Sequence, residues 1–474
     1  MIFNSITFLV FFILFFQFYW LINNKLPLFY RNIFIILSSY LFYGWWDWRF
    51  LSLIFISSLS DYVIGLGLTH TQKISYRKLL LVLSIVINLG ILGFFKYFNF
   101  FIGSLQELFR LFSLSVHTTT LKIILPVGIS FYTFQTLSYT IDIYNRKIEP
   151  TRDMASFFAF VSFFPQLVAG PIERAGHLLP QFFGKKEFSY NFCVQGLRLI
   201  LWGLFKKIVI ADNFGILADS LFEIHNPITG LTTLAGSLFF AFQIYADFSG
   251  YSDIAIGLSR MLGFDLMKNF KTPYFSSTFG EFWNRWHISL SSWFRDYLYI
   301  TLGGNRKKAF RVNLNIMVTF LLSGLWHGAH ITFLIWGGLH GLALLLEKRL
   351  KGNFKKISYA SLVFIVVTLL WIPFRAENFN HFTVLSKSLF QFNSYSVTSL
   401  CQVIGNFSVN RFILLIFVLT GFLGIEYQLK SDDFNEWVQK TSRFTRFTVY
   451  YVLIILLLLL GNFSVKPYFI YFQF

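Results

Sequence analysis

Charged residues are scarce in this chain. Of its 474 residues, 13% are Asp, Glu, Lys or Arg, whereas a soluble globular protein carries about 25%. Hydrophobic residues make up 55% of the chain and aromatic residues 21%. This balance excludes an ordinary soluble domain and predicts an all-α, polytopic integral membrane protein, because a helix of roughly 20 apolar residues spans a bilayer. The clearest apolar runs lie at 2–22, 79–95, 357–374, 412–425 and 447–465.

Other signals are also missing. The two cysteines, Cys193 and Cys401, form no metal or redox spacing. The chain has neither a phosphate-binding glycine loop nor a Gly-x-Ser-x-Gly elbow, which argues against the enzymes built on those motifs. The first charged residue is Lys25, so no basic segment precedes the opening apolar run. That order predicts a retained N-terminal anchor rather than a cleaved signal peptide.

The charges that are present are mostly positive, with a net charge of +18. In a membrane protein such an excess marks cytoplasmic loops, so we expect the bilayer rather than nucleic acid as the partner. Three basic stretches, at 69–78, 260–311 and 347–356, should therefore lie on the cytoplasmic side. Part of this charge would suit an anionic donor that arrives from the cytoplasm. No linker or repeat divides the chain, which predicts one membrane domain over residues 1–474.

His327 lies in the middle of a run, 312–346, that contains no Asp, Glu, Lys or Arg. Both flanks are basic, so the run should leave the cytoplasm and return to it. A single helix of this length would be about 50 Å long, and each arm of a hairpin about 22 Å, against a core of about 30 Å. The turn at 326–329 would thus lie within the membrane, where irregular backbone must be buried in protein or line a cavity.

His287 lies in a different setting, a stretch at 279–299 that is rich in tryptophan. Phe279, Trp283 and Trp286 begin an aromatic series at helical spacing, with Arg295 on an adjoining polar edge. This pattern predicts an amphipathic helix in the plane of the membrane surface. A structural surface helix anchored by its aromatic residues would show the same pattern.

Several motifs, taken in order, resemble the membrane-bound O-acyltransferase family, and its bacterial alginate O-acetyltransferase branch in particular. The motifs in the core at about 125–348 are Leu-Pro-Val-Gly-Ile-Ser-Phe at 125–131, Phe-Pro-Gln-Leu-Val-Ala-Gly-Pro-Ile at 164–172, Tyr-Ala-Asp-Phe-Ser-Gly-Tyr-Ser-Asp at 245–253, Asn-Phe-Lys-Thr-Pro-Tyr at 269–274, Phe-Trp-Asn-Arg-Trp-His-Ile-Ser-Leu at 282–290, Asp-Tyr-Leu-Tyr-Ile-Thr-Leu-Gly-Gly-Asn at 296–305 and Gly-Leu-Trp-His-Gly at 324–328. Residues 1–124 and 357–474 would supply further transmembrane helices.

The resemblance implies about eleven transmembrane helices, with re-entrant and interfacial helices, around a central funnel. It also implies that His327 is catalytic and that His287 lies at the cytoplasmic mouth where a thioester donor enters. A buried neutral imidazole at His327 could accept the proton of an acceptor hydroxyl. A histidine that only caps the hairpin turn is the structural alternative.

Other residues have less specific roles. Arg285 and Arg295 could bind the phosphates of coenzyme A, or serve only as topology signals, and Trp286 and Trp326 are predicted walls of the donor site. The intramembrane carboxylates Asp247 and Asp253 are predicted to hold a histidine or a backbone amide in place. His330 and His340 share the hairpin with His327, but one His-x-x-His spacing with no carboxylate is weak metal chemistry, so no metal site is predicted.

The sequence therefore predicts an acyltransferase of the cytoplasmic membrane. It would move an acetyl group from acetyl-coenzyme A, with no bound cofactor, for O-acetylation of an envelope polysaccharide such as alginate-like exopolysaccharide or peptidoglycan. A separate extracytoplasmic transferase or esterase-fold protein is an expected partner. The alternatives are D-alanyl transfer to teichoic acid from a carrier protein and a transporter without covalent chemistry.

Overall fold

The computed structural model describes residues 1–112, 121, 123–223, 225–349, 356–405, 407–429 and 433–462, and every regular element in these ranges is a helix. The predicted all-α class is therefore confirmed. Eight helical segments of the described chain are long and apolar enough to cross a membrane: Ile6–Lys25, Leu28–His70, Ile74–Arg110, Gly230–Met261, Ala309–His327, Ile331–Arg349, Val409–Leu429 and Arg443–Leu460. The apolar run at 357–374 forms a shorter helix, Tyr359–Arg375. The count of eleven stays a prediction, and the end of the run at 447–465 lies outside the described residues.

The chain divides into two compact units. The first comprises Met1–Val194 and Leu258–Met267, and the second comprises Gln195–Gly257 and Lys268–Phe474. The expectation of a single domain over 1–474 is not tested by this division and stays a prediction.

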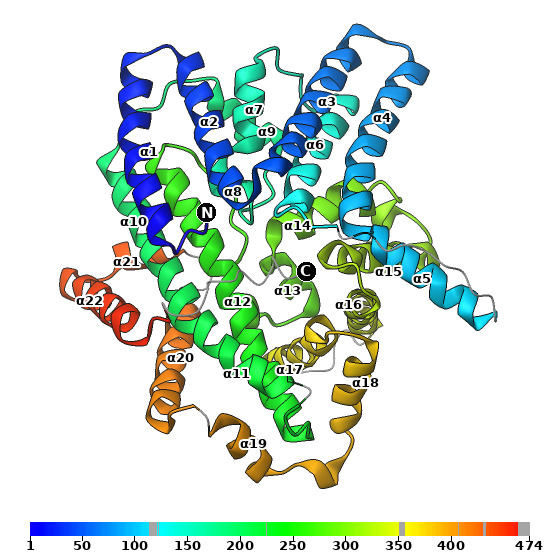
Figure 1. Ribbon diagram of the computed structural model, residues 1–474, viewed down its shortest axis with the longest axis vertical. Helices are drawn as coiled ribbons and strands as arrows, with labels where there is room; N and C mark the ends of the chain where they lie inside the picture. The colour runs from blue at the N-terminus through cyan, green and yellow to red at the C-terminus, as the bar shows by residue number, and fades with distance from the viewer. Residues whose placement is uncertain are drawn as a thin grey trace. The chain divides into compact units, whose positions relative to one another are not determined.

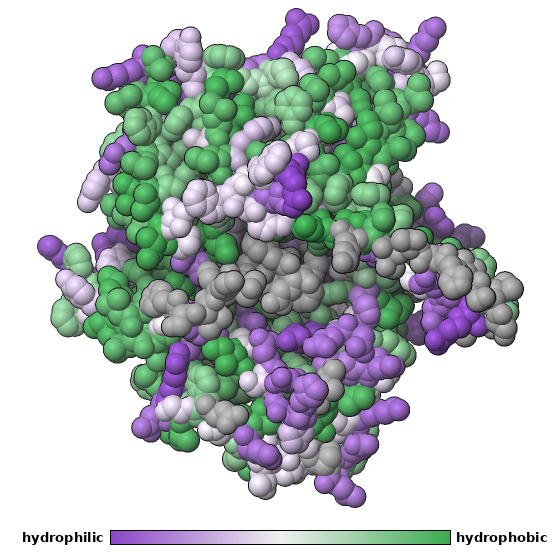
Figure 2. Space-filling model, in the orientation of Figure 1, coloured by the Kyte–Doolittle hydropathy of each residue, from purple (hydrophilic) through white to green (hydrophobic). Residues whose placement is uncertain are grey.

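The first unit is built from helices whose outer faces are apolar (Figures 1 and 2). Helix α6 packs against α3 and α4, and α7 packs against α2. Leucine, isoleucine and phenylalanine side chains of α1 to α4 are exposed, as expected of helices that face lipid. The elements are α1 (Ile6–Lys25), α2 (Leu28–Asp47), α3 (Leu51–His70), α4 (Ile74–Leu92), α5 (Phe98–Leu111), α6 (Ile129–Tyr144), α7 (Met154–Ser162), α8 (Phe164–Leu167) and α9 (Ala175–Leu178).

Buried polar clusters fix the helices of this unit. Asp61 of α3 accepts hydrogen bonds from Ser84, from Asn88 Nδ2 at 2.6 Å and from Thr140 Oγ1 at 2.9 Å. These bonds join α3 to α4 and α6, and they satisfy a carboxyl group that would be costly to bury alone.

A second cluster in this unit surrounds His177. Its Nδ1 lies 2.8 Å from Glu173 Oε2, and its Nε2 lies 3.6 Å from Asp265 Oδ2. Glu173 is fully buried, and its Oε1 also accepts a hydrogen bond from the backbone N–H of Met267. The cluster thus joins the short α9 segment to the 265–267 segment.

The second unit is also helical in its described part, and it contains both histidines singled out above. Its core brings together Trp202, Trp286, Trp336 and Trp371, from four separate elements. The elements are α10 (Tyr190–Leu204), a π-helical turn (Phe205–Ala211), α11 (Asp212–Phe222), α12 (Gly230–Met261), α13 (Phe279–Arg285), α14 (Ile288–Trp293), a second π-helical turn (Phe294–Tyr299), α15 (Ala309–His327), α16 (Ile331–Arg349), α17 (Lys356–Arg375), α18 (Phe379–Ser388), α19 (Val397–Ile404), α20 (Val409–Leu429), α21 (Phe434–Lys440) and α22 (Arg443–Leu460).

Candidate active site

The hairpin predicted around His327 is confirmed. Helix α15 ends at His327, and α16 begins at Ile331 and runs back against α15. Glycines let the two backbones approach closely, because a Cβ atom at Gly324 would lie 2.2 Å from the carbonyl oxygen of Phe333. A Cβ at Gly337 would likewise lie 2.2 Å from the carbonyl oxygen of Phe320. Close packing through small residues is how membrane helices associate, and here it places the buried His327 at a rigid turn.

The single surface helix predicted over 279–299 is wrong. The stretch is broken into α13, α14 and a π-helical turn, and His287 separates the first two in a left-handed conformation with φ of 43°. Trp283, Trp286 and Trp293 are all buried, and His287 is 1% exposed. The aromatic series therefore packs into the protein core and does not anchor a helix at the membrane surface.

A network around Asn269 holds the His287 turn in place. The carbonyl oxygen of Asn269 accepts from the N–H of Ile288 at 2.9 Å. Its side-chain Oδ1 accepts from Ser289 Oγ at 2.6 Å, and its Nδ2 donates to Ser252 Oγ at 3.1 Å. A non-glycine residue in the left-handed region costs of order 1–3 kcal/mol and often marks a functional site. Asn269 was not among the predicted site residues, although it begins one of the motifs.

The two histidines are neighbours. Their ring centroids lie 6.2 Å apart, and the ring of Trp326 lies 5.8 Å from His287 and 5.0 Å from His327. Phe248 of α12 contacts His287 at 4.6 Å, and Trp336 contacts His327 at 5.0 Å. This arrangement corrects the expectation that one histidine lies at the surface and the other at depth. Burial lowers the pKa of His287 to about 3, so its ring is neutral at physiological pH.

A pocket of about 590 Å³, which we call the Arg295 pocket, lies beside α13 and α14. Ile288, the residue after His287, lines it, and Arg295 and Lys348 give it two cationic groups. Its other lining residues come from α13, α14, the segment 299–305, α15 and the C-terminal end of α16, and include Trp283, Asn284, Ser291, Ser292, Tyr299, Asn305, Thr319, Phe320, Ser323 and Glu347.

Glu347 fixes one wall of the Arg295 pocket. Its two carboxylate oxygens accept hydrogen bonds from the backbone N–H groups of Phe279 and Gly280, at 2.9 and 3.0 Å. The hydroxyl of Tyr359 donates to the same carboxylate at 2.9 Å. Three elements are joined at this point, so Glu347 acts as a positioning residue. From the sequence it was only the single acid of a basic stretch.

A second pocket, of about 400 Å³, lies at the turn of the hairpin, and we call it the Gly328 pocket. Gly328, the residue after His327, lines it, together with Ala329, His330, Phe333, Arg375, Ala376 and Glu377. The residues that directly follow the two histidines, Ile288 and Gly328, thus line two separate hollows, and neither histidine lines either of them.

The remaining predicted site residues are distributed unevenly around these pockets. Trp326 contacts both histidines, and Arg295 lines the first pocket. Arg285 forms an ion pair with Glu281 at 2.6 Å and does not line that pocket. Trp286 is fully buried among aromatic rings, with Trp371 at 5.0 Å. The roles of these residues in binding or catalysis stay predictions.

Asp247 and Asp253 form ion pairs with lysines. Asp253 Oδ2 lies 2.6 Å from Lys206 Nζ, and Asp247 Oδ1 lies 2.7 Å from Lys207 Nζ, which also meets Asp212 at 2.8 Å. The lysines belong to the π-helical turn after α10, so these pairs attach that turn to α12. Asp247 directly precedes Phe248, so the network supports the helical turn that contacts His287.

The two other hairpin histidines have separate surroundings. His340 is buried among the rings of Phe282, Trp283 and Trp336. His330 caps the start of α16, because its Nδ1 accepts a hydrogen bond from the N–H of Thr332 at 3.3 Å. In the described part of the chain, no three histidine, cysteine or acidic side chains are grouped to hold a metal ion.

Comparison with known proteins agrees with this architecture. Residues 150–372 match the family model described as MBOAT, membrane-bound O-acyltransferase family. The chain is 42% identical over 408 residues to a protein of Pseudomonas putida named probable alginate O-acetylase AlgI, covering 84% of this chain and 82% of the relative. The chain therefore belongs to the membrane-bound O-acyltransferase family, and the protein is a multi-pass membrane O-acyltransferase that uses an acyl donor.

The names of two further relatives refer to different acceptors and different acyl groups. The peptidoglycan O-acetyltransferase of Helicobacter pylori is 36% identical over 420 residues, covering 82% of this chain and 78% of the relative. The teichoic acid D-alanyltransferase of Bacillus subtilis is 27% identical over 232 residues, covering 46% of this chain and 58% of that protein.

Proposed function

We propose that this protein takes an acetyl group from acetyl-coenzyme A for the O-acetylation of an envelope polysaccharide. His327 acts as the general base. The observation that carries the proposal is a buried pair of neighbouring histidines whose next residues, Ile288 and Gly328, line the cationic Arg295 pocket and the Gly328 pocket. The names of the Pseudomonas putida and Helicobacter pylori relatives support an acetyl group and a polysaccharide acceptor, either alginate-like or peptidoglycan.

The donor would occupy the Arg295 pocket. Its phosphates would meet Arg295 and Lys348, since arginine and lysine are the usual partners of phosphate groups. Its thioester would then point past Ile288 toward the histidine pair. The basic character of 260–311 supports a cytoplasmic mouth for this pocket, in a protein of the cytoplasmic membrane.

The reaction follows from the position of His327. The acceptor hydroxyl gives its proton to the neutral imidazole while its oxygen attacks the thioester carbonyl. His287 or the indole N–H of Trp326 would donate to the oxygen that becomes negative in the tetrahedral intermediate. When the carbon–sulfur bond breaks, the imidazolium returns the proton to the leaving thiolate. The products are the O-acetyl ester and free coenzyme A.

D-alanyl transfer from a carrier protein is the second candidate. It rests on the teichoic acid D-alanyltransferases of Streptococcus thermophilus and Bacillus subtilis, which match less than half of this chain. For acetyl transfer, an extracytoplasmic transferase would be a partner that passes the acetyl group on in a second step.

The test uses purified full-length protein and labelled acetyl-coenzyme A. We expect binding of the donor and release of free thiol on addition of the acceptor. Binding and thiol release only with a D-alanyl carrier protein would reject acetyl transfer in favour of the second candidate.

A further inference from the structure

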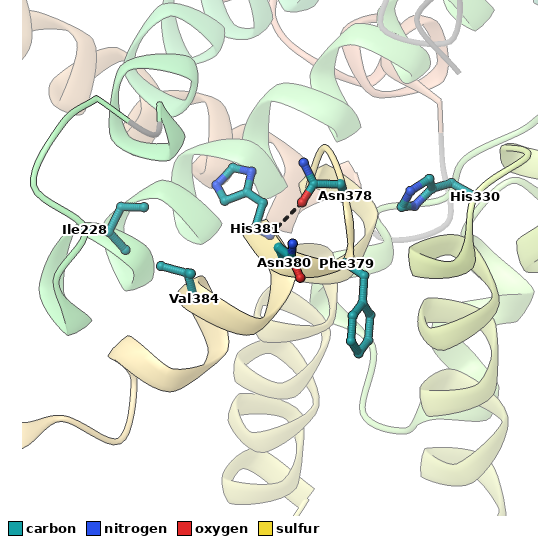
Figure 3. A pocket seen from close by; sticks show the side chains of 7 residues that line it. All are labelled: Ile228, His330, Asn378, Phe379, Asn380, His381 and Val384. Carbon is teal, nitrogen blue, oxygen red and sulfur yellow. Dashed lines mark hydrogen bonds between the residues drawn. The ribbon is translucent and has the colours of Figure 1, made fainter. Parts of the chain in front are cut away.

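A third hollow adjoins the Gly328 pocket, and we call it the His330 pocket (Figure 3). Its volume is about 510 Å³. His330 lines both hollows, so the two meet at this residue, three positions after His327. The other lining residues are Ile228, Asn378, Phe379, Asn380, His381 and Val384.

Among the residues that the structure describes, the lining of the His330 pocket contains no acidic or basic side chain other than its two histidines. Burial lowers the pKa of His330 and also that of His381, which favours their neutral forms. The Arg295 pocket, by contrast, holds Arg295 and Lys348. A neutral lining of this kind has no group that would pair with the phosphates of a nucleotide donor.

Hydrogen bonds within the wall of the His330 pocket determine which of its polar groups can donate to a ligand and which can accept from it. The N–H of Thr332 donates to His330 Nδ1, so the neutral ring carries its proton on Nε2, which is then a donor. Asn378 Oδ1 accepts from the N–H of His381 at 2.8 Å, which fixes its carboxamide at the start of α18 (Figure 3). Asn380 adds a second carboxamide, which both donates and accepts.

An aromatic ring completes the wall. Phe379 is 49% exposed although it is a large apolar side chain. A sugar ring presents hydroxyl groups that donate and accept at its rim and C–H groups on its faces. Carboxamides and an imidazole donor would suit the rim, and an exposed phenyl ring would suit a face.

From this lining we infer that the His330 pocket binds a sugar unit of the acceptor saccharide and directs one hydroxyl through the Gly328 pocket to His327. This inference rests on the proposed function for the identity of the reaction. It goes beyond that function by assigning the acceptor site to Asn378, Phe379, Asn380 and His330.

The test measures saccharide binding and acetyl transfer separately. The probes are oligosaccharides prepared from alginate and from peptidoglycan, added to purified full-length protein in lipid nanodiscs. Binding is measured by calorimetry without donor, and transfer is measured with labelled acetyl-coenzyme A. We expect one probe to bind and to be acetylated.

Three variants locate the site. Asn380→Ala and Phe379→Ala should each raise the Kd and the KM of the saccharide about tenfold, the effect of removing one good contact, without raising the KM of acetyl-coenzyme A. His330→Asn keeps an acceptor near the Nδ1 position, and so the cap on α16, but deletes the Nε2 donor, and it should have the same effect. The matched controls Asn393→Ala and Phe392→Ala change exposed residues outside the pocket and should leave both constants unchanged.

The outcomes separate the two proposals. Unchanged saccharide Kd in all three pocket variants would overturn the sugar site and leave acetyl transfer standing. Thiol release that requires an extracytoplasmic protein, with no binding of either oligosaccharide, would also overturn it, in favour of a hydroxyl carried by that protein. Absence of donor binding and thiol release alongside normal, pocket-dependent saccharide binding would instead reject the proposed function.

Discussion

The Arg295 pocket and the His330 pocket lie at opposite ends of the same helical hairpin, and their chemistry differs. The first is lined by Arg295, Lys348 and Glu347, whereas the second offers carboxamides, imidazoles and an exposed phenyl ring. The histidine pair is surrounded by aromatic rings, and the Gly328 pocket, which shares His330 with the His330 pocket, is lined by Arg375 and Glu377 as well as by apolar side chains. Such a division suits a catalyst that receives a charged donor at one end and a neutral hydroxyl at the other. The charge of each pocket, rather than its size, distinguishes the two ends.

The largest effect should come from removing the base between the two pockets. His327→Ala should lower the rate of transfer by about 10²–10⁴-fold, the usual contribution of a general base. Donor binding should persist, because the Arg295 pocket is unchanged. Labelled acetyl transfer at matched membrane abundance checks this, with the exposed His225→Ala as control. Near-normal transfer would favour a purely structural role for His327 at the hairpin turn.

A second prediction separates charges that bind a ligand from charges that hold the fold. Lys207 is buried between Asp247 and Asp212, so Lys207→Met leaves uncompensated carboxylates and should destabilise the protein by about 3–5 kcal/mol. Thermal unfolding in detergent measures the effect. Lys307→Met, at an exposed position, should leave the unfolding temperature unchanged. A stable Lys207→Met protein would show that the ion pairs do not hold the turn on α12.

The cationic groups of the Arg295 pocket can be removed directly. Replacing Arg295 and Lys348 together with alanine should raise the KM of acetyl-coenzyme A about tenfold, because each loses a charge-assisted contact with phosphate. The increase should shrink at high salt, which screens the same attraction in the wild type. The KM of the acceptor should stay constant. A rise in the acceptor KM instead would reverse the assignment of the two ends.

The smallest expected effect is a pH dependence of stability that comes from His177. The pKa values of His177 and His287 are shifted in opposite directions. Hydrogen bonds with the carboxylates of Asp265 and Glu173 raise the pKa of His177 to about 10, whereas burial lowers that of His287. A raised pKa stabilises the fold fully below pH 6.5 and loses that contribution as pH rises through about 10. The stability advantage of wild type over His177→Gln should therefore decline between pH 6.5 and 10. If the difference in stability between wild type and His177→Gln stays constant across that pH range, the protonated His177 does not stabilise the fold.

The sequence predicted those parts of this site that depend on charge and length. The charge-free run around His327, flanked by basic stretches, was sufficient to predict a hairpin and its turn. The same reasoning failed for 279–299, because helical spacing of Trp283 and Trp286 fits a buried helix as well as a surface one. A left-handed residue at His287 leaves no signal in hydrophobic periodicity, so the break between α13 and α14 was missed.

Contacts between segments that are distant in the sequence could not be predicted from local patterns. Asn269 supports His287 through Ser289, and Glu347 joins α13 to α16, but neither pairing follows from a local pattern. Lys206 and Lys207 stand out in an apolar segment, and that anomaly could have suggested partners for Asp253 and Asp247. The proximity of His287 and His327, forty positions apart, required the fold itself.

We expect donor and acceptor to reach the histidine pair from opposite sides of the membrane. Single cysteines at Ser292 in the Arg295 pocket and Asn380 in the His330 pocket, in a protein lacking Cys193 and Cys401, test it with an impermeant maleimide on sealed vesicles of each orientation. The cysteine at 292 should be labelled only from the cytoplasmic side, and coenzyme A should protect it from labelling. The cysteine at 380 should be labelled only from the opposite side, without such protection. Labelling of both positions from the same side would contradict the account.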